Sequence, residues 1–148
     1  MSMYTTISET NTYFETRLHT DAWDEASTTE RTAALTMATE AIDRLNFLGK
    51  MAEDDQELQF PRDEDTDVPN DIKKACSEIA LALLDGVEPE MEFENLGLVS
   101  QGYSNVRSTY DRSRAPEHIV AGIPSITAWR YLKPYLRDYR SVQIHRVS

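Results

Sequence analysis

Three aspartates at alternate positions form the most metal-like pattern in the chain. Asp63, Asp65 and Asp67 match the first three ligand positions of a calcium-binding loop, whose carboxylate oxygens coordinate the ion. The match then ends, because a valine stands where such a loop needs glycine and a lysine where it needs a bidentate glutamate. With Glu64, these residues are predicted to form a solvated acidic loop that faces a channel or a partner. Weak, adventitious cation binding is the alternative.

The other side chains that could do chemistry are scattered. His19, His118 and His145 lie far apart, without the paired spacing of a zinc-binding helix. Cys76, the single cysteine, falls on an apolar helical face, where a thiol more often packs than reacts. Neither the G-x-x-x-x-G-K-[ST] nor the G-x-G-x-x-G phosphate-binding pattern occurs. We therefore expect no enzymatic activity, no metal and no cofactor.

Two capping boxes mark the starts of two helices. Thr6 and Glu9 predict a helix over residues 6–18, with an apolar side that includes Tyr13, Phe14 and Leu18. Trp23 is predicted to follow in a turn. Ser27 and Glu30 form the second box and open a helix over residues 28–48, with Gly49 as its stop.

A third helix is predicted over residues 70–85. Pro69 suits its first turn, and apolar residues then recur at three- and four-residue spacing until Gly86. The two long helices are expected to pack on each other, which predicts a mainly α fold: a small bundle of about four helices. The residues expected to be buried are Ala38, Ala41, Ile42, Leu45, Ile72, Ile79, Leu83 and Phe60.

The chain changes character after Gly86. Residues 93–112 have no helical period and are rich in Ser, Thr, Tyr and Val, which favours a short β-rich segment. A fourth, short helix is predicted around residues 124–132, ended or kinked by Pro134. We expect one helical domain over residues 1–136 and an extended C-terminal arm over residues 137–148, with a frayed terminus as the alternative.

The link between the two long helices carries a candidate structural anchor. Proline biases the residue before it toward an extended conformation, so Leu58 and Phe60 can turn into the core on either side of Gln59. Arg62, directly after Pro61, is then expected to meet carboxylates or helix carbonyls.

Charge divides the chain unequally. The net charge is −11, but the first 97 residues carry 23 acidic and 7 basic residues, whereas the remainder carries 3 acidic and 8 basic. An acidic front half argues against wrapping around a nucleic-acid backbone, because such binding depends on Lys and Arg displacing counterions. The acidic half suits a channel through which DNA passes without being bound. The alternative is that the acidic residues serve only to keep the protein soluble. No stretch reaches the roughly 20 apolar residues of a membrane span.

The order of these features resembles the small head-to-tail connector, or adaptor, proteins of tailed bacteriophages. The resemblance covers residues 4–85 well and the later strand and Leu132–Leu136 regions more loosely, and some relatives carry the label of a primosomal-protein-like single-stranded-DNA-binding domain. The chain departs from the family in having Phe60 where tryptophan is common, and in its unusually acidic loop. The features of this chain that carry the resemblance are an aromatic pair on a first helix, a tryptophan turn, an Ala-rich helix, Gln56-x-Leu58-x-Phe60-Pro61-Arg62, and Pro69-x-x-Ile72-x-x-Ala75.

This resemblance implies a virion protein at the neck that forms a ring of twelve copies beneath the portal. Such a ring extends the channel for double-stranded DNA and presents a surface to the tail. The basic C-terminal third suits an arm that docks on the portal or a neighbouring copy, by steering and strand pairing. The docking residues would be Arg137, Tyr139, Arg140, Val142, Ile144 and Arg146.

The competing hypothesis is a replication accessory protein that binds single-stranded DNA. That function needs a basic groove with interleaved aromatic residues on which bases stack. The best candidates form a short stretch attached to an acidic body: Tyr103, Arg107, Tyr110, Arg112 and Arg114.

Overall fold

Helices α1 (Ile7–Phe14) and α3 (Thr28–Asp43) both begin at the predicted capping boxes. Thr6 Oγ1 accepts a hydrogen bond from the Glu9 amide, and Ser27 Oγ accepts one from the Glu30 amide. In each box the glutamate side chain in turn accepts a hydrogen bond from the backbone amide of the capping residue. These bonds satisfy N–H groups that have no acceptor within the helix. The computed structural model describes residues 2–91 and 116–137.

The first helix is shorter than predicted. It ends at Phe14, which is buried, and Leu18 lies beyond it with 77% of its surface exposed. Trp23 is buried within a short helix, α2 (Asp21–Glu25), rather than in a turn, and its indole nitrogen donates to Asn11 Oδ1 at 2.8 Å. A tertiary contact to α1 therefore fixes this segment.

Helix α3 also ends early, at Asp43 rather than at residue 48. Gln59, from the segment that follows, donates from Nε2 to the backbone oxygens of Asp43 and Leu45, each at 2.7 Å. These bonds satisfy carbonyls that a helix end leaves unpaired, so the chain can turn away without a local stop signal.

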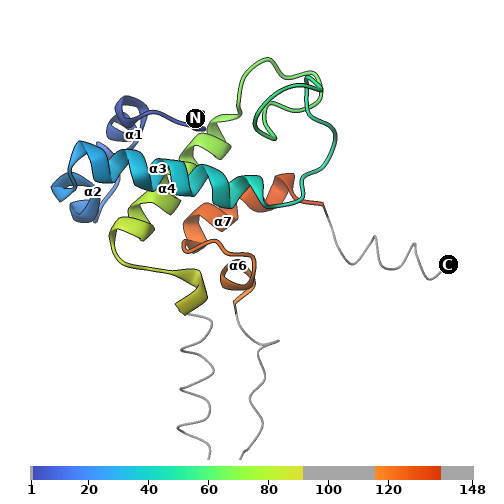
Figure 1. The fold of residues 1–148 in the computed structure, drawn as a ribbon. Helices are drawn as coiled ribbons and strands as arrows, with labels where there is room; N and C mark the ends of the chain where they lie inside the picture. The colour runs from blue at the N-terminus through green and yellow to red at the C-terminus, as the bar shows by residue number, and fades with distance from the viewer. Residues whose placement is uncertain (1, 92–115, 138–148) are drawn as a thin grey trace, which may run out of the picture.

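Helix α4 (Asn70–Leu84) is the central element and contacts α1, α2, α3 and α7. Figure 1 shows α3 crossing α4, with α1 and α2 at one side of the crossing and α7 at the other. Because neighbours cover it on several sides, seven consecutive residues from Ala75 to Leu81 are buried. Burial is confirmed for six of the eight predicted residues, while Ala41 and Leu83 are half-buried.

The described C-terminal part forms two more α-helices and a 3-10 turn, namely α6 (Glu117–Val120), α7 (Ile126–Leu132) and η2 (Lys133–Tyr135). Ser125 caps α7 by accepting from the Ala128 amide, and Pro134 sits in η2, where the α-helix ends as predicted. Helix α6 was not predicted. Leu136 then forms an isolated antiparallel bridge with Phe47.

The fold is mainly helical, as the sequence predicts. Extended pairing within the two described ranges is limited to isolated bridges, Phe47 with Leu136 and Met51 with Arg62. The predicted β-rich segment 93–112 and the arm beyond residue 137 lie outside the described residues.

Candidate functional site

The crossover, residues 44–69, links α3 to α4 and holds the predicted anchor. Phe60 is 4% exposed, and its ring meets those of Tyr4, Phe47 and Tyr135 with centroids 6.0, 4.6 and 5.9 Å away. Leu58 is half-buried against the same core. Phe60 therefore joins the N-terminal segment, the crossover and η2, in addition to lying in the core shared by the long helices.

Arg62 lies within the crossover rather than reaching carboxylates or helix carbonyls. Its Nε donates to the Leu48 carbonyl at 2.8 Å, and its Nη2 donates to the Gly49 carbonyl at 2.7 Å. Its Nη1 donates to the backbone and side-chain oxygens of Gln59 at 3.2 and 3.1 Å. These acceptors are loop groups, so the buried guanidinium holds the two limbs of the crossover together, next to the cis peptide bond that joins Phe60 to Pro61.

Asp63, the first residue of the acidic loop, is hydrogen-bonded to Lys50 on the other limb of the crossover. Asp63 donates its amide to the Lys50 carbonyl at 2.7 Å, and its Oδ1 accepts from the Lys50 amide at 3.1 Å. Asp63, Glu64, Asp65 and Asp67 are all exposed. Across the described ranges, no three His, Cys, Asp or Glu side chains gather as metal ligands.

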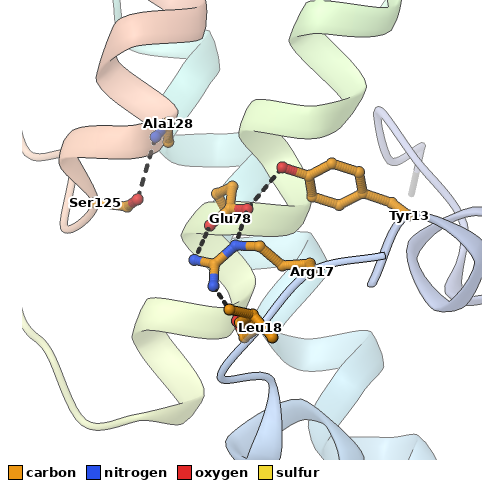
Figure 2. A network of polar contacts seen from close by, with 6 residues as sticks. All are labelled: Tyr13, Arg17, Leu18, Glu78, Ser125 and Ala128. Atoms are coloured by element: carbon orange, nitrogen blue, oxygen red, sulfur yellow. Dashed lines mark hydrogen bonds and ion pairs between the residues drawn. The ribbon is translucent and has the colours of Figure 1, made fainter. Parts of the chain in front are cut away.

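A buried ion pair, which sequence reasoning missed, connects the chain after α1 to α4. Glu78 is 2% exposed, and Arg17 donates two hydrogen bonds of 2.9 Å to its carboxylate, from Nε and from Nη2. The Tyr13 hydroxyl donates to the same carboxylate at 2.7 Å, and Arg17 Nη1 also donates to the Leu18 carbonyl (Figure 2). Tyr13 lies within α1, whereas Arg17 and Leu18 follow its end at Phe14, which lets Arg17 turn back toward α4.

The environment of this pair shifts the pKa values of its partners. Burial, and then the hydrogen bond to Glu78, raise the pKa of Tyr13 well above its usual range. The hydrogen bonds to Glu78 raise the pKa of Arg17. The one available sequence signal was a glutamate within the apolar run of α4, at a position where an unpaired charge would be costly.

Most cations of the described part already have partners within the chain. Residues 2–91 and 116–137 contain 22 acidic and 10 basic residues. Seven of the basic side chains contact a carboxylate or a carbonyl: Arg17, Arg31, Arg44, Arg62, Lys73, Lys133 and Arg137. This part of the surface is therefore acidic and offers few unpaired cations to a polyanion.

One predicted docking residue, Arg137, lies against the chain's own crossover. Its amide donates to the Asn46 carbonyl at 3.0 Å, and its Nη2 reaches the Phe47 carbonyl at 3.4 Å. At residue 137 the chain therefore still contacts the crossover. Tyr139, Arg140, Val142, Ile144 and Arg146 lie outside the described residues, as does the basic and aromatic stretch at 103–114.

Two of the side chains considered for catalysis, Cys76 and His118, contact other groups of the chain. Cys76 is buried, and burial raises the pKa of its thiol to about 11. His118 contacts the Ile123 carbonyl through Nδ1 at 2.8 Å. Each helix within the described ranges is too short or too polar to cross a bilayer.

The fold and its contacts define a small, acidic, mainly helical protein built around one central helix. Residues 2–146 match the family described as "Putative DnaT-like ssDNA binding protein", and the chain belongs to this family. No curated protein and no solved structure matches the chain.

Proposed function

We propose that the chain is a structural, non-enzymatic assembly subunit: a head-to-tail adaptor of a tailed bacteriophage. In this proposal several copies form a ring beneath the portal, extend the channel for double-stranded DNA and offer a surface to the tail. Its place would be the neck of the virion, after assembly in the host cytoplasm. Its partners would be its own copies, the portal and a tail or neck protein.

The acidic surface with internally paired cations carries this proposal. Nucleic-acid affinity comes largely from Lys and Arg that neutralise phosphates, and here most of the described cations are held by carboxylates or carbonyls of the same chain. The excess of carboxylates repels a polyanion at short range. Such a surface can border a DNA path without retaining the DNA, and the resemblance to phage adaptors supports the same function.

A second candidate is a protein that binds single-stranded DNA, and the family description favours it directly. Its requirements are cations and aromatic residues on one surface. In this chain Tyr103, Arg107, Tyr110, Arg112 and Arg114 supply both types within a short stretch outside the described residues. The two candidates thus assign the DNA contact differently: one to passage along an acidic body, the other to retention by a basic segment.

A salt titration separates the candidates. A labelled oligo-dT strand is titrated with the full chain over a range of KCl concentrations, with fluorescence anisotropy as the readout. The adaptor proposal predicts no saturable binding at physiological salt. Affinity that falls steeply with salt, and is lost in an Arg107→Ala, Arg112→Ala, Arg114→Ala variant, would establish the second candidate instead. Electron micrographs of the purified protein and of virion necks then test directly for the ring.

A further inference from the structure

An open apolar groove runs between α3, the end of α4 and the turn before α7. It has a volume of about 590 Å³ and is lined by Met37 and Ala41 of α3, by Ile79 and Leu83 of α4, and by Pro124. Met37 is 54% exposed, although thioethers usually fill gaps in a core. The groove therefore leaves apolar side chains uncovered within the described part of the molecule.

The groove has an acidic edge. Glu88 and Glu90, after the end of α4, and Glu30, on α3, line it, and all three are exposed. Arg44 is the one basic residue among its described lining. An apolar floor with this rim suits an occupant that carries aliphatic side chains flanked by cations.

We propose that this groove binds the C-terminal segment, residues 138–148, of a neighbouring copy of the chain. The inference rests on the proposed ring function and deepens it, because it specifies a contact between copies. The segment has the complementary composition, since Val142 and Ile144 alternate and Arg140 and Arg146 flank them. In a ring the contact repeats head to tail, so each copy both gives a segment and receives one.

The segment is long enough to reach a neighbouring copy, and charge supports that copy as its source. The 11 residues span at most roughly 36–40 Å when extended, which exceeds the diameter of a small domain, about 30 Å. Arg137 is held at Asn46, just beyond α3, so a segment that turned back into its own groove would start beside Arg44. A segment from another copy can approach from the acidic side.

A charge-swap titration tests the contact. A fluorescent peptide with the sequence of residues 138–148 is titrated with the full chain and with a Glu88→Lys, Glu90→Lys variant, each at a concentration where sedimentation shows single copies. We expect saturable binding to the native chain and at least tenfold weaker binding to the variant. A peptide with Arg140→Glu and Arg146→Glu should reverse this order. The matched control is Glu53→Lys, Asp55→Lys, which makes the same charge change on the exposed crossover and should preserve native affinity.

Each other outcome overturns the groove contact. Peptide that does not bind the native chain, at a protein concentration where sedimentation shows single copies with no neighbour to fill the groove, shows that no neighbouring segment is received there. Binding that weakens equally in the control variant shows a general charge effect. Rings seen by electron microscopy together with either result would leave the proposed function standing, whereas peptide binding without rings would remove the adaptor function alone.

Discussion

At the scale of single residues, the buried carboxylate of Glu78 depends on Arg17. Its side chain is 1% exposed, while Arg17 retains 30% exposure and supplies two donors in the planar geometry that a carboxylate accepts. A buried carboxylate without that partner would keep its desolvation cost and lose the compensating attraction. The pair therefore fixes the chain after α1 against α4.

Arg17→Met should destabilise the protein by about 3–5 kcal/mol, because it leaves the Glu78 carboxylate buried with the Tyr13 hydroxyl as its remaining side-chain donor. Arg17→Met combined with Glu78→Met should recover most of that loss, since no unpaired charge remains. Urea denaturation of the two variants and of the native chain measures both effects.

The control is Lys73→Met, which removes the 2.8 Å ion pair with Glu9. This pair also links α1 to α4, but its two side chains are 32% and 44% exposed, so the loss should be at most about 1 kcal/mol. Equal losses at the two sites would contradict the role assigned to burial.

At the scale of elements, contacts between Gly49–Lys50 and Asp63 hold the two limbs of the crossover together. The sequence pattern does not predict these contacts. Gly49 has φ +78°, and a Cβ placed on it would lie 2.3 Å from Asp63 Oδ2. Asp63 in turn has φ +54° and bonds to both backbone groups of Lys50. The close approach of Gly49 and Asp63 therefore joins the two limbs of the crossover.

Gly49→Ala should cost about 2–4 kcal/mol, from its left-handed backbone conformation and from displacement of the Asp63 carboxylate. Gly86→Ala is the matched control, because Gly86 has φ +89° with open space around it, and only the conformational cost of about 1–2 kcal/mol applies. Thermal unfolding measures the stability loss of both variants. A Gly49→Ala variant no less stable than the Gly86→Ala variant would contradict the contribution assigned to the close approach of Gly49 and Asp63.

At the scale of the whole molecule, the sequence predicted the features that depend on interactions between residues close together in the chain. The capping boxes and apolar stripes located the starts of α1, α3 and α4, because caps and periodicity act within a few residues. The end of α3 and the Arg17–Glu78 pair were missed, since Gln59 and Glu78 act across 14 to 61 positions of the chain. The candidate groove likewise combines parts of three distant segments, which periodicity could not bring together.

Alkaline pH should destabilise the folded protein. Burial is the largest cause that raises the pKa values of Tyr4, Tyr13 and Cys76, so the folded state holds protons that the unfolded chain releases. The associated stability is present below the ordinary pKa values and is lost as pH rises through the folded ones. For Cys76 this window runs from 9.0 to about 11.

Urea midpoints measured from pH 7 upward should therefore fall above about pH 9. Tyr13→Phe removes one of the three groups and should make the decline shallower, although it also lowers the starting stability by removing a hydrogen bond to Glu78. A midpoint that stays constant or rises in this range would contradict the predicted linkage.

The position of the chain's one cysteine has a kinetic consequence. Cys76 lies near the middle of α4 with no exposed surface, so a thiol reagent can reach it only when the helix separates from its neighbours. When reclosing is faster than the reaction, the rate of modification is proportional to the fraction of molecules that are open. The native thiol thus reports rare opening events, and a thiol reagent can detect them under native conditions without an engineered cysteine or a denaturant.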